Sequence, residues 1–262
     1  MSLLLAVDVG NTNIVLGVFD LTQGQSSPLM HSWRIATTRE RTADEYGLMF
    51  QELLRHQGKD LSQVSEMVFG SVVPPLHPVL ETCSQRYFNT HPLWVEPGVD
   101  IILKVAIDHP NELGADRIAN CVGAIEMHGT PAITVDLGTA TTFDIVNNKC
   151  EYIGGLILPG IKIAAEALFQ RAAKLPRVEI VKPLGIVGRN TIQAMQAGLY
   201  YGCIGQIDGI LERLIAEFPG AVVVATGGLA KTVGKESKYI NHVESDLTLN
   251  GLRSIWYRNR KK

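Results

Sequence analysis

Cysteine is scarce in this 262-residue sequence, and its four copies are widely separated. Cys83, Cys121, Cys150 and Cys203 form no Cys-x-x-Cys pair. Structural zinc sites and disulfide frameworks use cysteines at short, regular spacings, so this distribution argues against both. We therefore expect the protein to work in a reducing compartment, the cytoplasm.

Long apolar segments are also missing. The apolar run at residues 3–7 has no basic leader before it and is interrupted by Asp8. A helix that crosses a bilayer needs about 20 apolar residues, and no run approaches that length. We expect a protein that is neither exported nor associated with a membrane.

Neither sign of charge dominates. The formal net charge is −2, with 46% hydrophobic and 19% charged residues, which is typical of a globular protein. Such a balance gives no general attraction to nucleic acid, so we expect no nucleic-acid partner. Concentrated charge occurs only at the C-terminus, in Arg258, Arg260, Lys261 and Lys262, which we interpret as a solvated tail without a ligand.

Two common nucleotide-binding motifs are absent as well. The sequence contains neither Gly-x-x-x-x-Gly-Lys-Ser/Thr nor Gly-x-Gly-x-x-Gly, which excludes a Walker phosphate loop and a Rossmann dinucleotide loop. If the chain binds a nucleotide, backbone amides, threonine hydroxyls and cations must neutralise the phosphates without a loop lysine. We then expect modest nucleotide affinity and a strong requirement for cations.

What is present is an alternation of apolar β-branched segments with amphipathic ones. In the first half, strands are expected at residues 3–7, 14–19, 32–36 and 67–73. Thr42 and Glu45 form a capping box for a helix that stops before Gly58. Two prolines start a second helix at about residues 76–87, and Asn111 caps a third that extends to about residue 128.

The same order begins again after Gly129. We expect strands at 132–135, 142–146, 152–158 and 222–225, and helices at 160–174, 191–218 and 247–258. No disordered linker separates the halves. The sequence therefore predicts an α/β fold with two domains, residues 1–119 and 120–262.

Two short turns at equivalent places in these halves resemble each other. Asp8-Val9-Gly10-Asn11-Thr12-Asn13 aligns with Asp136-Leu137-Gly138-Thr139-Ala140-Thr141, at a separation of 136 − 8 = 128 residues. Turn amides and hydroxyls bind phosphate oxygens, glycine lets the backbone approach a ligand, and an acid can hold a cation or its waters. A single Asp-x-Gly is more typical of an ordinary hairpin turn. Two copies favour a duplication whose turns bind the phosphates and metal of a nucleotide.

A third glycine-rich segment leaves two interpretations open. Ala225-Thr226-Gly227-Gly228 follows a predicted buried strand. It is either a further contact near the base or ribose of a nucleotide, or a tight exit from the strand.

These features together resemble the actin, Hsp70 and sugar kinase superfamily, in which two duplicated ribonuclease-H-like domains with mixed sheets flanked by helices close on ATP. Within that superfamily the sequence resembles the type III pantothenate kinases. The resemblance covers nearly the whole chain. It rests on the motifs DVGNTN (8–13), GSVVP (70–74), NELGADRIAN (111–120), VDLGTATTFD (135–144), GGLILPG (154–160) and GRNT (188–191).

The resemblance implies ATP-dependent phosphorylation of pantothenate to 4'-phosphopantothenate, the first step of coenzyme A biosynthesis. It gives Asp116 the role of catalytic carboxylate. A hydroxyl that attacks a γ-phosphate needs a carboxylate to accept or orient its proton, which agrees with that role. From position alone, Asp116 is instead an ordinary acid of a first helical turn or the partner of a neighbour such as Arg117.

The resemblance also implies the binding residues. The ATP contacts are Asp8, Val9, Gly10, Asn11, Thr12, Asn13, Ile14, Val15 and Thr139, with Asp8 holding Mg²⁺ through water. The pantothenate contacts are Gly114, Ala115, Asp116, Arg117 and Thr191, and Asp136 is the ligand of a monovalent cation, K⁺ or NH₄⁺. The family closes its pantothenate pocket with a second subunit, which implies a homodimer whose interface lies in the C-terminal domain.

One position departs from the family pattern. Many relatives have a tyrosine seven residues before the glycine of Gly-Ala-Asp-Arg, where this sequence has Ile107. Nearby His109 is either a polar replacement or a surface loop residue. Two other functions therefore stay open: a kinase for another small hydroxy acid, and a regulatory accessory factor of the same fold without kinase turnover.

Overall fold

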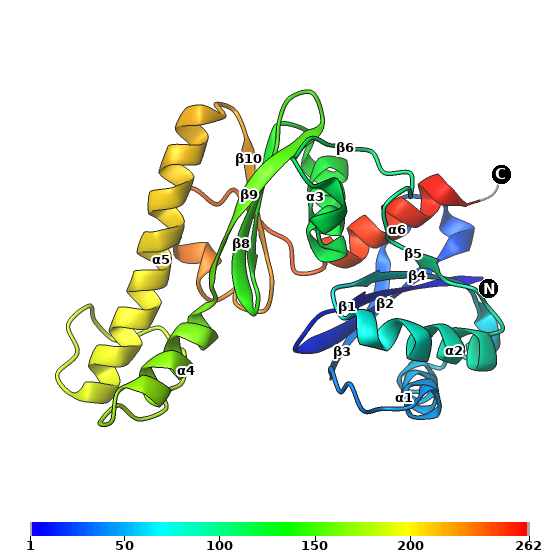
Figure 1. The fold of residues 1–262 in the computed structure, drawn as a ribbon, viewed down its shortest axis with the longest axis horizontal. Helices are drawn as coiled ribbons and strands as arrows, with labels where there is room; N and C mark the ends of the chain where they lie inside the picture. Colours follow the sequence, from blue (N-terminus) through cyan, green and yellow to red (C-terminus); the bar gives the residue numbers. More distant parts are fainter. Residues whose placement is uncertain (1, 261–262) are drawn as a thin grey trace. The chain divides into compact units, whose positions relative to one another are not determined.

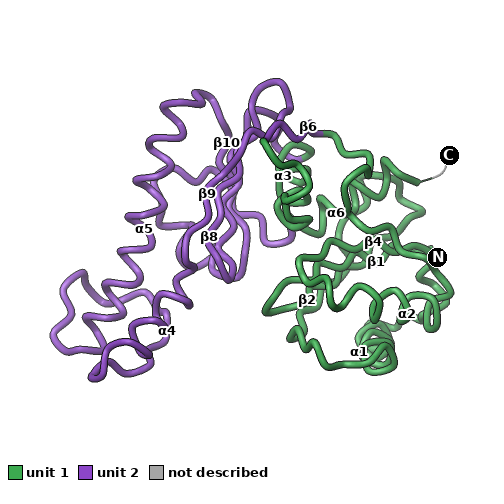
Figure 2. Tube along the Cα trace, in the orientation of Figure 1, with its two compact units in different colours: residues 1–102, 108–126, 247–262 green, residues 103–107, 127–246 purple. Residues whose placement is uncertain are grey.

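The computed structural model describes residues 2–260, and the chain folds into two compact units, which Figure 2 colours separately. The first unit contains the residues up to 102, 108–126 and those from 247 onward, and the second contains 103–107 and 127–246. These units differ from a single division after residue 119. The chain returns to the first unit at its end, and a short segment before Asp108 belongs to the second.

The first unit is built on a five-stranded mixed sheet with the order β3-β2-β1-β4-β5 (Figure 1). Its elements are β1 (Leu3–Val9), β2 (Asn13–Asp20), β3 (Leu29–Ala36), α1 (Ala43–Arg55), β4 (Val64–Ser71), α2 (His77–Phe88), β5 (Leu93–Trp94), α3 (Ala115–His128) and α6 (Leu247–Asn259). β1 pairs antiparallel with β2 and parallel with β4.

Both faces of this sheet are covered. Alternate β1 residues, among them Leu5 and Val7, share a buried core with Tyr46 of α1 and Leu80 of α2. Helix α6 packs on the other face, where Gly17 of β2 makes room for a leucine of α6. Because β1 is buried on both sides, it is a nearly continuous apolar run rather than an alternating one.

The second unit is built on a six-stranded sheet with the order β11-β10-β7-β8-β9-β6. Its elements are β6 (Lys104–Val105), β7 (Ala132–Leu137), β8 (Ala140–Val146), β9 (Glu151–Pro159), α4 (Ile161–Arg171), α5 (Thr191–Glu217), β10 (Val222–Thr226) and β11 (His242–Val243). Helix α5 packs on this sheet, with Tyr200 and Leu211 in one buried core with Ile133 and Val135.

The two sheets repeat one topology. Without the edge strand β6, the order β9-β8-β7-β10-β11 matches β3-β2-β1-β4-β5, and corresponding pairs run in the same relative directions. This repetition confirms the predicted α/β fold with two duplicated mixed sheets flanked by helices. β6 pairs parallel with β9 and satisfies that edge, which is why residues 103–107 belong to the second unit.

One of two predicted helix caps is confirmed and the other is wrong. The capping box of α1 is confirmed: Thr42 N donates to Glu45 Oε2 at 2.7 Å, and Glu45 N donates to Thr42 Oγ1 at 3.3 Å. Asn111 as a helix cap is wrong, because it lies in the 3₁₀ helix η4 (Pro110–Glu112) and α3 begins only at Ala115. Pro110 favours that separate short turn, after which the backbone becomes extended at Leu113.

The predicted C-terminal tail is partly helical. Arg258 lies in α6 and its Nη2 donates to Asp100 Oδ1 at 3.3 Å, while the guanidinium of Arg260 lies 4.6 Å from the ring centre of Tyr257. The lysines at 261 and 262 lie outside the described residues. Between residues 2 and 260, no helix combines the length and the apolar character needed to cross a membrane.

Candidate active site

The first turn (residues 8–13) connects β1 to β2 and is braced by the residue that follows β3. Gly10 N donates to Asn13 O at 3.0 Å, Thr37 Oγ1 donates to Gly10 O at 2.6 Å, and Thr37 N donates to Thr12 O at 3.0 Å. Asn11 and Thr12 are exposed at the tip. The turn therefore has a fixed backbone and presents amide and hydroxyl groups, which suit phosphate oxygens.

The other predicted ATP contacts of this half lie in the strands that carry the turn. Asp8 pairs with Val15, and Val9 pairs with Ile14, in the β1–β2 ladder. Val9 and Ile14 are fully buried, so their side chains pack in the core and position the turn rather than face a ligand.

A cationic residue that the sequence analysis did not single out lies at this turn. Arg39 is exposed, and its Nη2 donates to Asn11 Oδ1 at 3.4 Å. The turn itself contains no lysine, but an arginine side chain reaches it. Its distance along the sequence from the turn, 28 residues, explains why no motif search indicates it.

Asp116 lies in the same unit, in the first turn of α3. Arg117 N donates to Asp116 Oδ1 at 2.8 Å, and the carboxylate folds back over Gly114, where an ideal Cβ would lie 2.5 Å from Oδ1. Any side chain at 114 would force the carboxylate to move. The motif Gly-Ala-Asp-Arg therefore has a local geometric reason for its glycine.

Packing places this helix start beside the end of β4, the strand next to β1. Val72 N donates to Val9 O at 3.0 Å, which extends the pairing of β4 with β1. A Cβ on Gly114 would contact Val72 Cγ1 at 3.3 Å, and one on Gly70 would contact Ala115 Cβ at 3.6 Å. The structure thus brings the start of α3 to the end of the strand next to the one that carries Asp8.

The environment of Asp116 favours a proton acceptor. Burial away from water raises the pKa of its carboxyl group above the ordinary value, and the hydrogen bond from Arg117 N and the Arg117 charge only partly oppose this. A carboxylate that is desolvated but still held by a backbone donor is a stronger base than an exposed one.

The second turn (residues 136–141) connects β7 to β8 and is tighter. Gly138 N donates to Ala140 O at 3.1 Å, and Thr139 is exposed at the tip. Val9 faces Ile14 across the first turn, whereas Leu137 faces Thr141 across the second, so the second is one residue shorter. The gapless alignment of the two turns is therefore correct up to the tips and shifted by one residue beyond them.

The carboxylate of Asp136 is enclosed by glycine backbone. An ideal Cβ would lie 3.1 Å from Asp136 Oδ1 at Gly138 and 2.4 Å at Gly227, whose φ of +94° already favours glycine. Of the two interpretations of the segment at 225–228, this contact supports the tight strand exit. Because Gly227 has no side chain, the backbone can run next to the carboxylate of Asp136 without a clash.

The threonines around the second turn have a structural role that the motif did not indicate. Asp144, at the end of that motif, is fully buried in β8. Tyr152 Oη donates to it at 3.0 Å, and the hydroxyls of Thr134 and Thr142 lie 3.5 and 3.4 Å away. Buried carboxylates need such partners, so part of the hydroxyl content of this segment stabilises an internal acid.

Thr191 and Ile107 lie elsewhere in the second unit. Thr191 begins α5, directly after the cap Asn190, whose Oδ1 accepts from Gln193 N at 2.9 Å. It lines a pocket of about 650 Å³ with residues of α4, α5 and the segment before α5. Ile107 is partly buried after β6, and His109 is exposed, as expected of a surface loop histidine.

The two sheets share one strand order and carry duplicated turns, and a carboxylate lies at a helix start in the first unit. These features define the class of protein as one with an actin-like fold, of the kind found in sugar kinases. Solved structures with low sequence identity agree on the fold. A proposed Baf family transcriptional activator from Campylobacter jejuni matches with a TM-score of 0.58 at 19% identity, over 97% of this chain and 98% of that one. Lmo2764 from Listeria monocytogenes, a proposed N-acetylmannosamine kinase, matches with 0.53 at 10% identity, over 99% and 100%.

Sequence comparison defines the family within that class. The type III pantothenate kinase family model matches residues 4–213. Type III pantothenate kinases from Koribacter versatilis and Myxococcus xanthus are 51% and 52% identical to this chain, over 98% of it in each case and over 96% and 99% of their own lengths. The chain belongs to the type III pantothenate kinase family.

Proposed function

We propose that this protein transfers the γ-phosphoryl group of ATP to the primary hydroxyl of pantothenate, forming 4'-phosphopantothenate in the first step of coenzyme A biosynthesis. The observation that carries the proposal is Asp116: a desolvated carboxylate at the start of α3, beside the end of β4 and in the same unit as the first turn. It has this setting in a chain about half identical to type III pantothenate kinases.

Asp116 acts as the general base. Its carboxylate accepts the proton of the pantothenate hydroxyl while the oxygen attacks the γ-phosphorus, and the bond from that phosphorus to the β–γ bridging oxygen breaks to release ADP. The hydrogen bond from Arg117 N fixes one carboxylate oxygen, which orients the group toward the substrate. Positioning and proton transfer are the main contributions a protein makes to a phosphoryl transfer.

The two turns bind ATP and its cations. In the first turn and its strands, Asp8 through Val15 supply amides and polar side chains for phosphate oxygens, and in the second turn Thr139 supplies a further contact. The donor chemistry fits hard cations, since each turn begins with a carboxylate, Asp8 or Asp136, and that of Asp136 lies against the backbone of Gly138 and Gly227. Asp8 would hold Mg²⁺ through water and Asp136 would hold K⁺ or NH₄⁺. When bound, these ions spread the negative charge that moves during transfer.

Pantothenate is bound by Gly114, Ala115, Asp116 and Arg117, with Thr191 as a further contact. Exposed apolar side chains near Thr191 support a homodimer. Leu184, Ile186, Val187 and Ile192 each expose more than half of their surface, an unusual density for a monomer's face. Burying them against a second subunit would remove that surface from water, in the cytoplasmic setting that we propose. Sedimentation equilibrium of the purified protein tests this state.

Two alternative functions are a kinase for another small hydroxy acid and a regulatory protein without kinase turnover. Ile107 in place of the usual tyrosine favours testing other small hydroxy acids as acceptors. The fold is shared with a proposed transcriptional activator, which motivates a regulatory alternative without turnover. A desolvated carboxylate at the start of α3 favours catalysis over that alternative, because a nucleotide-dependent clamp has no need for a base.

The deciding experiment is a coupled ADP-release assay with pantothenate, ATP, Mg²⁺ and K⁺, comparing wild type with Asp116→Asn. General-base removal should lower kcat by about 10²- to 10⁴-fold. Glu112→Gln is the matched control, because Glu112 is an exposed acid in the 3₁₀ helix just before α3. Turnover in wild type only with another hydroxy acid would replace the substrate, and unchanged turnover in Asp116→Asn would remove Asp116 as the base.

A further inference from the structure

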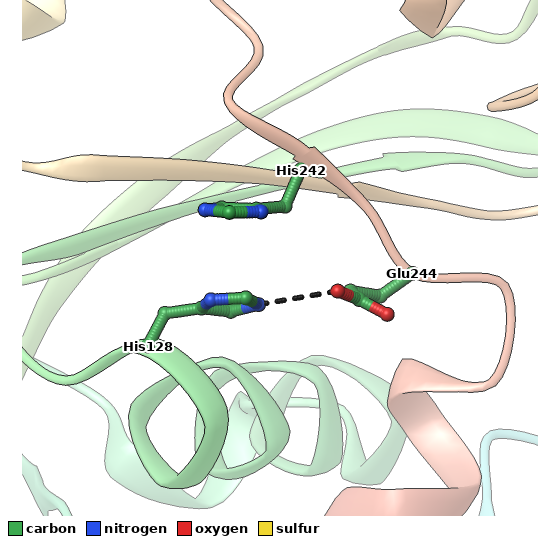
Figure 3. Close-up of side chains that lie close together, drawn as sticks. All are labelled: His128, His242 and Glu244. Carbon is green, nitrogen blue, oxygen red and sulfur yellow. Dashed lines mark ion pairs between the residues drawn. The ribbon is translucent and has the colours of Figure 1, made fainter.

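A cluster of three potential metal ligands lies in the second unit, and none of its residues is among those assigned to phosphoryl transfer. It consists of His128 at the end of α3, His242 in β11 and Glu244 just after β11, as Figure 3 shows. One ligand atom from each side chain lies within 4.8 Å of the other two. Between residues 2 and 260 no other group of three histidine, cysteine or acidic side chains meets this criterion.

The ligand atoms are already close. His128 Nε2 lies 3.3 Å from Glu244 Oε1, and the ring centres of His128 and His242 are 4.1 Å apart with nearly parallel planes. The side chain of His128 is only 14% exposed and that of Glu244 30% exposed, while His242 is exposed. Two imidazoles and a carboxylate thus lie close together, one nearly buried, one partly buried and one exposed.

The backbone that carries two of these ligands is fixed. Asn241 N donates to Val223 O at 2.9 Å and Glu244 N donates to Ala225 O at 2.8 Å, which ties residues 241–244 to β10 on both sides of His242. Asn241 Oδ1 also accepts from Val223 N at 2.7 Å. A site on such a paired strand is held more precisely than one on a free loop.

One polar atom in the cluster lacks its normal partner. His128 Nε2 is buried and has no hydrogen-bond partner among the described residues, because its contact with Glu244 lacks hydrogen-bond geometry. A buried imidazole nitrogen without a partner loses its hydration and gains nothing in return. A metal ion in line with its lone pair would compensate that loss directly.

We propose that His128, His242 and Glu244 bind a divalent transition-metal ion of the zinc class. Neutral imidazole with one carboxylate is a donor set that suits Zn²⁺, Co²⁺ and Ni²⁺ rather than Mg²⁺ or K⁺. Tetrahedral zinc holds its ligand atoms about 3.3 Å apart, so the cluster needs a contraction of roughly 1.5 Å from its widest separation. The exposed side chain of His242 can supply that movement by rotation, and a water would take the fourth position.

Such an ion would act on the fold rather than on the phosphoryl transfer. Met127 is the first residue of the second unit along α3, and Asp246 is the last before the chain enters α6. His128 and Glu244 therefore stand within a few residues of two of the four places where the chain passes between units. Metal binding would join these two segments within the second unit and suppress their local opening.

Isothermal titration of metal-free protein with Zn²⁺, and with Co²⁺ to obtain visible d–d absorption, tests the proposal. We expect one ion per chain. His242→Gln and Glu244→Gln should weaken binding by at least the 10- to 100-fold that loss of a supporting contact costs at metal sites. Both changes are at exposed or partly exposed side chains, so circular dichroism should show that the variants fold.

His91→Gln is the matched control. It removes a histidine that lies 3.4 Å from Glu81, a similar histidine–glutamate pair outside any three-ligand cluster. Unchanged Zn²⁺ affinity in this variant together with weakened affinity in the other two supports the site. Wild-type protein that binds no Zn²⁺, or equal affinity in all variants, overturns it. No outcome depends on kinase turnover, so this result and that of the kinase assay are independent.

Discussion

The first and second turns occupy equivalent places in the two sheets but are held in different ways. In the first unit, the residue after β3 is Thr37, and its hydroxyl donates to Gly10 O at 2.6 Å. In the second unit, the residue after β9 is Gly160, and its backbone lies so close to the turn that an ideal Cβ would be 2.2 Å from Thr139 O. The same topological position thus braces both turns, once through a side chain together with a backbone N–H and once through backbone contact alone.

The difference shows what a duplicated topology determines and what it leaves variable. Strand order determines which residue meets the turn, because the third strand of each sheet ends beside the hairpin of the first two. Turn length determines what that residue can be. The longer first turn leaves room for a threonine side chain, while the second turn is one residue shorter and admits only backbone.

The largest expected difference between the turns is in the ions that they hold. Asp8→Asn should lower kcat/KM for ATP by about 10²-fold, because a bound metal supplies several kcal/mol of charge stabilisation. Asp136→Asn should instead raise the K⁺ concentration needed for half-maximal turnover. Initial rates measured over separate Mg²⁺ and K⁺ titrations distinguish the two effects. If both variants change the same cation dependence, the turns do not differ in this way.

The backbone brace of the second turn is the next most sensitive point. Gly160→Ala forces a methyl group against Thr139 O and should lower the free energy of unfolding by about 1–3 kcal/mol, as overpacking does. Gly185→Ala is the control, because its Cβ would meet no atom within 4 Å and should change stability by less than about 0.5 kcal/mol. Urea unfolding measures both. Equal stability of the two variants would mean that the turn can move away from the added methyl.

A third difference is that the first unit also carries the proposed base. Burial raises the pKa of Asp116 above the ordinary 3.8, so kcat/KM should fall as the pH drops through that raised pKa. Below it, kcat/KM should fall by about tenfold for each pH unit. The raised pKa also means that ionisation of Asp116 opposes folding as pH rises through it. Asp116→Asn should therefore raise Tm at neutral pH, and this gain should disappear below pH 3.8. An acid limb that persists in residual turnover of Asp116→Asn would assign it to another group.

Much of the fold and of the candidate site can be predicted from the sequence, because regular local patterns indicate them. Apolar β-branched runs with turn residues between them predict β1, β2, β7 and β8 within a few residues, and the capping box predicts the start of α1. Asp116 and the two turns are found from motifs. Their signals are local, so neighbouring residues along the chain are enough to recognise them.

What the sequence does not indicate depends on contacts between distant residues. β5, β6 and β11 have two residues each, too few for any periodicity, and they exist because a neighbouring strand offers unpaired edge groups. Arg39 reaches the first turn, and Gly160 meets the second, only after whole strands have paired. His128 and Glu244 meet although 116 residues separate them (244 − 128 = 116). No local sequence pattern predicts these contacts between distant residues.

The side-chain brace of the first turn gives the smallest effect and the sharpest comparison. Thr37→Val keeps the shape of the side chain but removes the hydroxyl that donates to Gly10 O, which should cost about 1 kcal/mol of stability. The carbonyl that loses its donor belongs to the turn proposed to bind phosphate. If the same free energy, about 1 kcal/mol, is lost from the ATP-bound state, KM for ATP should rise about fivefold. Thr37→Ser keeps the donor and should resemble wild type in both measurements.

Together, the two variants at position 37 separate hydrogen bonding from packing. If only Thr37→Ser weakens ATP binding, the methyl group rather than the hydroxyl supports the first turn, and the two halves would both be braced by packing. If only Thr37→Val does so, the halves use different physical means at one topological position. Steady-state KM for ATP, with urea unfolding of the same preparations, decides between these outcomes.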